Sequence, residues 1–123
     1  MKTFTTLFFA FILSNNSLAA EPIYLECKVP SLTTELLITL NQTSGKVTQT
    51  YKANGSGFTS DAQFNADEII YEKKIASLGQ TERYTINRKT LAINHAIFTS
   101  GNGVATVNKD GTCIIVKTEN NKI

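Results

Sequence analysis

A two-residue alternation of apolar and polar side chains constrains the fold of this chain more than any other feature. In residues 23–29, for example, Ile23, Leu25, Cys27 and Val29 occupy every second position. No long window shows the 3.6-residue stripe of an amphipathic helix. A period of two is typical of strands that bury one face, so we expect an all-β domain.

Turn-forming residues interrupt the alternation about every eight to twelve residues, which predicts eight or nine short strands. The predicted strands are residues 23–29, 36–40, 46–52, 62–64, 68–74, 81–87, 91–98, 104–108 and 112–118. A turn is expected at Lys109–Gly111.

Every predicted connection is short enough for a hairpin, so neighbouring strands can pair as an antiparallel meander. Closing such a sheet removes its unpaired edges. We therefore favour a small up-and-down barrel of about eight strands over a sandwich. The side chains expected to fill its interior are Phe58, Phe64, Tyr71, Tyr84, Ile86 and Phe98.

Residues 1–19 have the anatomy of a cleavable export signal. Lys2 precedes an apolar run, Phe4–Leu13, and small residues follow. The run is about half the length of the roughly twenty residues that a spanning helix needs. Ser17 and Ala19 fit the small −3 and −1 positions, so we expect cleavage after Ala19, with Ala20 as the near alternative.

Cleavage would leave residues 20–123 as a single β domain. No small-residue triplet leads into Cys27, so we expect neither lipid attachment nor membrane insertion. The short signal with one lysine is typical of bacteria, which predicts a periplasmic location, with secretion as the alternative. Without Lys2, the 12 basic residues become 11, against 10 acidic ones, and this balance gives no argument for binding nucleic acid.

The two cysteines, Cys27 and Cys113, lie near opposite ends of the predicted domain. An even cysteine count in an exported chain predicts a disulfide. A shared metal is the alternative, but two thiols and the single histidine, His95, are too few ligands for a closed zinc site. We expect no metal or other cofactor.

Catalytic residues are not indicated. A hydrolase would need His95 beside a nucleophile and an orienting acid, and the chain has no Gly-x-Ser-x-Gly motif. His95 alternates with apolar residues, which predicts a histidine at the edge of the core. The acidic residues lie in turns or alternate with apolar ones, as solvated acids do; they are Asp61, Asp67, Glu68, Glu72 and Glu82. We therefore expect a protein that is not an enzyme.

Recognition by a loop is the more promising interpretation. The segment Asn54-Gly55-Ser56-Gly57 lacks the lysine of a P-loop and predicts an open hairpin loop, and rigid scaffolds carry function on such loops. The candidate binding residues are Lys46, Tyr51, Asn54, Gly55, Ser56, Gly57 and Phe58. Five basic residues group on one predicted hairpin and its following turn, either as a solvated face or as a contact for an acidic partner; they are Lys73, Lys74, Arg83, Arg88 and Lys89.

Four segments resemble a loose group of small exported proteobacterial proteins of unknown function. They are Tyr24–Cys27, Phe64–Ile69, the Tyr-x-Ile-Asn-Arg-x-Thr run Tyr84–Thr90, and Gly111–Cys113. The resemblance spans most of the domain and implies no established activity. Leu91 stands where that group usually has a turn glycine.

A fainter likeness is to the periplasmic C-type lysozyme inhibitors. These are small barrels closed by a terminal disulfide, and a Ser-Gly-x-x-Tyr loop enters the cleft of the enzyme. The nearest segment here is Ser44–Thr48, in which Thr48 replaces the tyrosine. We expect a periplasmic binding protein with a protein partner in the envelope, and this likeness implies inhibition of a hydrolase. The alternatives are a carrier of a small ligand in the barrel mouth and, last, a hydrolytic enzyme.

Overall fold

The computed structural model describes residues 21–99 and 103–116, so the predicted signal, residues 1–19, lies outside the described part. Its strands are β1 (Ile23–Lys28), β2 (Leu36–Asn41), β3 (Lys46–Tyr51), β4 (Gly57–Phe64), β5 (Glu68–Ile75), β6 (Gln80–Asn87), β7 (Ala92–Thr99) and β8 (Ala105–Val116). One 3₁₀ turn, Ala76–Leu78, joins β5 to β6. Within the described ranges, no helix has the length and apolarity that crossing a membrane requires.

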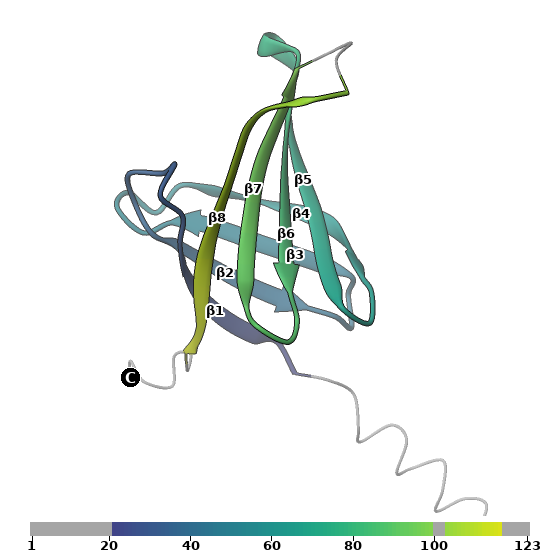
Figure 1. The fold of residues 1–123 in the computed structure, drawn as a ribbon. Helices are drawn as coiled ribbons and strands as arrows, with labels where there is room; N and C mark the ends of the chain where they lie inside the picture. Colours follow the sequence, from purple (N-terminus) through teal and green to yellow (C-terminus); the bar gives the residue numbers. More distant parts are fainter. Residues whose placement is uncertain (1–20, 100–102, 117–123) are drawn as a thin grey trace, which may run out of the picture.

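Each strand pairs antiparallel with its neighbours in sequence, and β1 pairs with β8 to close the barrel (Figure 1). This confirms the predicted all-β, up-and-down barrel of eight strands. The connections alternate between the two ends of the barrel. We call the end with the β1–β2, β3–β4, β5–β6 and β7–β8 connections the loop end, and the opposite end the mouth.

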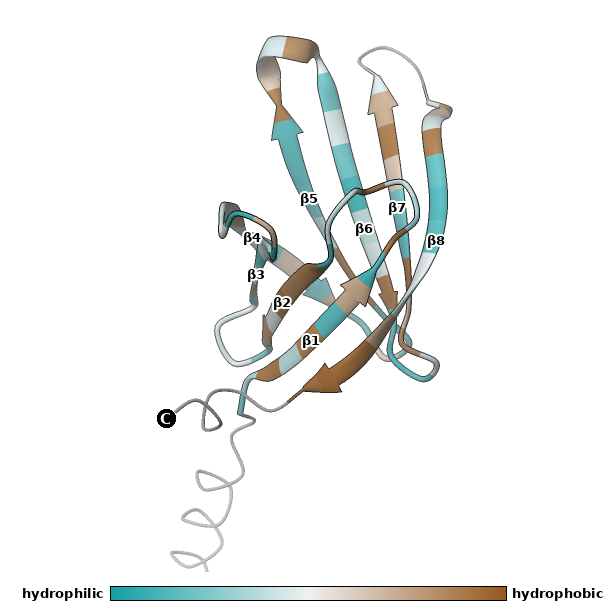
Figure 2. Ribbon diagram, turned by 90° about the vertical axis from the view of Figure 1, so that its left-hand side faces the viewer, coloured by the Kyte–Doolittle hydropathy of each residue, from teal (hydrophilic) through white to brown (hydrophobic). Residues whose placement is uncertain are grey.

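Strands β5 to β8 project beyond the barrel at the loop end (Figure 1). Only Ile69–Tyr71 of β5 pair with β4, so the rest of β5 runs past it. Figure 2 shows hydrophilic residues along the projecting parts of β5 and β8, and a strongly hydrophobic C-terminal part of β8 near the mouth. These hydrophilic residues suit a part of the sheet that extends past the rest of the barrel into solvent.

The turn predicted at Lys109–Gly111 is wrong, because these residues lie within β8. Lys109 pairs with His95 and Gly111 with Ile93, so pairing with β7 overrides the local turn preference. Gly111 has a different role. A Cβ at Gly111 would clash with the carbonyl oxygen of Lys28, so glycine lets β8 cross close to the end of β1.

The core consists of the inward-facing residues of the alternating pattern. Its largest fully buried members are Tyr71, Tyr84, Leu25, Leu36, Ile38, Ile86, Ile93, Gln49, Val47 and Cys27. Phe58 and Phe64 are partly buried against this core, as expected. Phe98 is not part of it, since a β-bulge at Ile97/Phe98 shifts the register there, and the guanidinium of Arg83 lies 4.8 Å from its ring centre.

The disulfide joins the first strand to the last. Cys27 and Cys113 are directly opposite on β1 and β8, and both are buried in the core. The predicted pairing is confirmed. Such a bond persists in oxidising compartments, which indicates that the domain works outside the cytoplasm.

The Cys27→Ala/Cys113→Ala double variant should lose about 4–5 kcal/mol of unfolding free energy. The reason is that the bond closes a loop across a sequence separation of 86 and so restricts the unfolded chain. Urea denaturation of the variant and of the reduced wild-type protein measures the loss in two independent ways. A loss below about 1 kcal/mol in both would contradict this role.

Candidate functional site

An aromatic ladder crosses the interior of the barrel toward the loop end. The strand register places Tyr71, Tyr84 and His95 side by side on β5, β6 and β7. The Tyr71 and Tyr84 rings stack with centres 5.1 Å apart, and the Tyr84 and His95 rings with centres 4.8 Å apart. Phe58 of β4 lies 6.3 Å from both tyrosine rings. These rings occupy the space that a central ligand would need.

A chain of hydrogen bonds runs from this ladder to the β1–β2 connection. His95 Nε2 lies 3.1 Å from Glu82 Oε1, and His95 Nδ1 lies 3.2 Å from Ser31 Oγ. A carboxylate can only accept, so His95 Nε2 donates to Glu82, and the Ser31 hydroxyl, which can donate or accept, is the partner of Nδ1. The Tyr84 hydroxyl donates to the same Glu82 oxygen at 2.7 Å. We call Ser31, Glu82, Tyr84 and His95 the polar cluster.

The polar cluster shifts the pKa of two of its members in opposite directions. The hydrogen bond from His95, followed by that from Tyr84, lowers the pKa of Glu82 against the opposing effect of burial. Burial, followed by the Glu82 carboxylate, raises the pKa of Tyr84 well above its usual range. The cluster therefore favours a charged Glu82 beside a neutral tyrosine hydroxyl.

The polar cluster has the order hydroxyl, imidazole and carboxylate, which is also the order of a serine-hydrolase triad. Here the imidazole is enclosed, with His95 only 2 % exposed and stacked on Tyr84. The contact of Ser31 with His95 holds the β1–β2 connection over the loop end of the barrel. The geometry supports a positioning role for the cluster.

Glu82 differs from the prediction that it is a solvated acid. Its side chain is 15 % exposed and bonded to His95 and Tyr84. The alternation of Glu82 with Tyr84 and Ile86 already places Glu82 on the core face. An acid on that face needs a hydrogen-bond partner, so its burial could have been predicted. The contact of Ser31 with His95 could not be predicted from the sequence, because it depends on the path of the β1–β2 connection.

Besides the polar cluster, a buried hydrogen-bonded pair, Tyr71 and Gln49, lies beside the ladder. The Tyr71 hydroxyl donates to Gln49 Oε1 at 2.6 Å, and burial raises the pKa of Tyr71 well above its usual range. Gln49 Nε2 is buried and has no hydrogen-bond partner among the described residues. The interior of the loop end is therefore polar as well as aromatic.

The structure brings together all but one of the predicted binding residues. Asn54, Gly55 and Ser56 form the exposed β3–β4 turn, where Asn54 Oδ1 accepts bonds from the Ser56 amide and hydroxyl at 2.9 Å. Tyr51 precedes this turn, and Gly57 and Phe58 follow it at the start of β4. Tyr51 and Phe58 are partly buried against the core, so they support the turn from below.

Lys46 lies apart from this group, at the mouth end of β3. Its Nζ forms an ion pair of 2.6 Å with Asp61 Oδ1. This pair crosses from β3 to β4 on the outside of the barrel, where Lys46 pairs with Asp61 in the sheet register. The placement separates Lys46 from the β3–β4 turn by the length of the strand.

The basic residues divide between the two ends. Lys73, Lys74 and Arg83 lie on the projecting β5–β6 hairpin, whereas Arg88 and Lys89 lie in the β6–β7 turn at the mouth. Arg83 is bonded to Glu72 at 2.9 Å, and Lys73 Nζ lies 5.3 Å from the Phe58 ring centre. The predicted group is thus two separate features, and the projecting hairpin carries the cations nearest the loop end.

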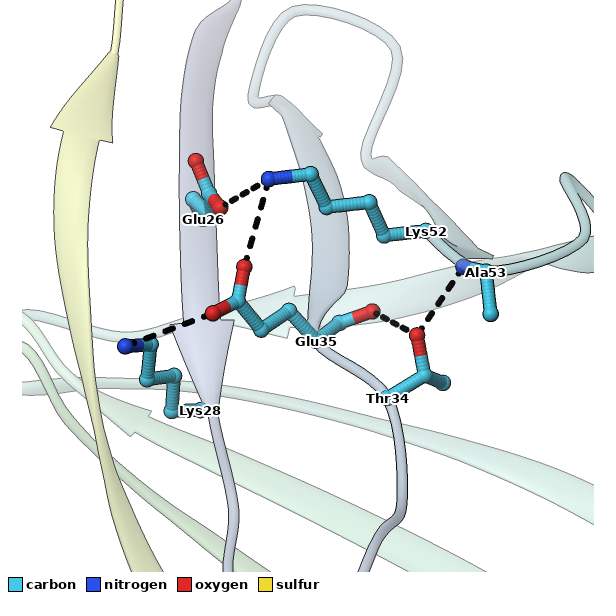
Figure 3. Close-up of polar contacts among 6 residues, drawn as sticks. All are labelled: Glu26, Lys28, Thr34, Glu35, Lys52 and Ala53. Carbon is cyan, nitrogen blue, oxygen red and sulfur yellow. Dashed lines mark hydrogen bonds and ion pairs between the residues drawn. The ribbon is translucent and has the colours of Figure 1, made fainter.

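A network of four charges stabilises the outside of β1 and its neighbours at the loop end (Figure 3). Lys52 Nζ lies 2.8 Å from Glu26 Oε2 and 3.3 Å from Glu35 Oε1, and Lys28 Nζ lies 3.3 Å from Glu35 Oε2. The adjacent Glu26 carboxyl, followed by Lys52 and Lys28, lowers the pKa of Glu35 to about 2. The network connects β1 to both the β1–β2 and the β3–β4 connections.

Comparison of the chain with models of protein families, with curated proteins and with solved structures finds no match. Among the residues that the structure describes, no group of three or more His, Cys, Asp or Glu side chains is placed to hold a metal ion.

Glu35→Gln should flatten the acid dependence of stability. The pKa of Glu35 is lowered from 4.5 to about 2 in the folded state, so its contribution is complete above pH 4.5 and disappears as the pH falls toward 2. Chemical denaturation at pH 6 and at pH 2.5 measures this difference. Glu68→Gln removes an exposed charge elsewhere and serves as the control. An unchanged pH dependence in Glu35→Gln would show that the network adds no stability.

Proposed function

We propose that this chain is a non-enzymatic binding protein of the bacterial periplasm, exported by a signal at residues 1–19. Its partner is another envelope protein, and the partner class that best fits the loop end is a hydrolase with an acidic cleft. The domain would act by inserting the end of its projecting sheet into that cleft.

The observation that carries the proposal is the exposed tip of the projecting sheet. Leu78 in the β5–β6 connection is 61 % exposed, and Val104 before β8 is 71 % exposed. Exposed apolar side chains on a protruding element are typical of contacts with a partner. Lys73, Lys74 and Arg83 lie on the same hairpin.

The exposed cations of this hairpin are Lys73, Lys74 and Arg83, of which Lys74 and Arg83 share an ion pair with Glu72. Hydrolases that cleave glycans place a pair of carboxylates in their cleft. An apolar tip fits such a cleft if its carboxylates replace Glu72 as the partner of Lys74 or Arg83. The β3–β4 turn opens at the same end of the barrel, where the Ser56 hydroxyl donates to Asn54 Oδ1 and keeps its own oxygen as an acceptor. The segment Ser44–Thr48 of the inhibitor likeness lies at the opposite end, so the proposal does not depend on it.

The interior of the loop end supports binding by the surface instead of by a pocket. The ladder of Phe58, Tyr71, Tyr84 and His95 fills the space between the strands. The polar cluster uses its hydrogen-bonding groups internally. We therefore infer that the partner is recognised by the connections at the loop end, which pack over the ladder and the polar cluster.

Leu78→Asp should weaken capture of the partner at least tenfold, because it places a negative charge on the surface that meets an acidic cleft. The experiment retains proteins from an envelope extract on immobilised domain, identifies the retained hydrolase and measures its inhibition. Ile114→Asp is the matched control, since Ile114 on β8 is also 61 % exposed but lies opposite Glu26 of β1, well away from Val104 at the tip. Melting curves establish that both variants fold.

Two results would contradict the proposal. One is equal retention and inhibition of the same hydrolase by the Leu78→Asp variant and the wild type. The other is turnover of an ester or glycan by the purified domain, with covalent labelling by a fluorophosphonate that Ser31→Ala abolishes. The second result would make the polar cluster a catalytic triad.

A further inference from the structure

The mouth contains an apolar cavity that the proposed function does not use. It has a volume of about 200 Å³ and lies at the end opposite the projecting sheet. Inward-facing side chains form its walls, among them Leu25, Leu40, Phe64 and Ile86. Glu21, Gln42 and Arg88 supply the polar part of the lining. The cavity is thus apolar inside, with few polar groups to orient a ligand.

Leu91 lines this cavity in a backbone conformation that leucine rarely adopts. Its φ is +64°, in the left-handed region that favours glycine. Its amide donates to the Asn87 carbonyl at 2.8 Å, and its carbonyl accepts from the Cys113 amide at 2.9 Å. The leucine side chain packs against the core and lines the cavity. It therefore supplies an apolar wall that a glycine at this position would not. Strain of this kind is concentrated at binding sites.

Arg88 is held at the cavity by the neighbouring turns. Its Nη1 donates to the Asn65 carbonyl at 2.7 Å, and its Nη2 donates to Gln42 Oε1 at 3.3 Å. A guanidinium has more N–H donors than these bonds use, and it matches the geometry of a carboxylate. Glu21 is the acidic residue of the lining.

We propose that the mouth binds a linear acyl chain that ends in a single carboxylate. The chain would enter the cavity between Leu40, Ile86 and Leu91, and the carboxylate would bind the guanidinium of Arg88. A dry cavity of about 150 Å³ accommodates benzene, so the volume here suits roughly six to eight carbons of a slender chain. This site is independent of the protein surface at the loop end.

Calorimetry of the mature, disulfide-bonded protein with hexanoate, octanoate, octanol and octylammonium tests the proposal. Affinity should rise about fourfold for each methylene from hexanoate to octanoate, because each is buried in an apolar environment. Octanoate should bind more tightly than octanol, and octanol more tightly than octylammonium. This series uses only the wild-type protein, so it is decisive even if a variant fails to fold.

Three variants assign the contacts. Arg88→Gln should lower octanoate affinity about tenfold and leave octanol binding unchanged, while Lys89→Gln, its neighbour in the same turn, should change neither. Leu91→Gly keeps the backbone conformation and should weaken every ligand. All three should retain the binding of the loop end to its protein partner, which separates this test from that of the proposed function.

Equal affinity for octanoate and octylammonium would overturn the proposal, because the guanidinium would then play no part. Absence of binding to any of the four compounds would overturn it as well. So would octanoate binding that Leu91→Gly leaves unchanged, since the ligand would then lie outside the cavity.

Discussion

Pairing of β1 with β8 is the constraint on which the other features of this domain depend. These two strands would be unpaired edges in an open sheet, and closure gives both of them a partner on each side. The Cys27–Cys113 bond lies within this pairing, and Gly111 allows the close approach of β8 to β1. Closure encloses the aromatic ladder at one end and the apolar cavity at the other.

The two ends of the barrel are filled by different chemistry, and each suits a different kind of recognition. At the loop end, rings and paired polar groups fill the interior, so the proposed recognition falls to the surface connections and the projecting sheet. At the mouth, apolar walls enclose a cavity beside Arg88. The proposed protein partner and the proposed acyl ligand would therefore contact different residues. The strands that connect the ends, β5 to β7, pair continuously from one to the other.

The sequence predicts the part of this structure that follows from local pattern. Alternation identifies the core face of β1 and β2, and cysteine count predicts the bond that closes the barrel. Features that depend on distant pairing are not accessible in this way: Lys109–Gly111 has turn chemistry but extends β8 along β7. The chain also gives no sign that Ser31 reaches His95, because sixty-four positions separate them along the chain. At Leu91 the resemblance indicates a turn glycine, and the positive φ of Leu91 shows why a glycine would suit that position.

Native-state hydrogen exchange at the β1–β8 pairing tests the account most directly. In the oxidised protein, the amides that join β1 to β8 should exchange only through global unfolding, like those between β5 and β6. After reduction of the disulfide, the β1–β8 amides should exchange through a separate opening of lower free energy, while the β5–β6 amides remain bound to global unfolding. Identical exchange of the two sets in the reduced protein would contradict the claim that this pairing, fastened by Cys27 and Cys113, holds the barrel closed.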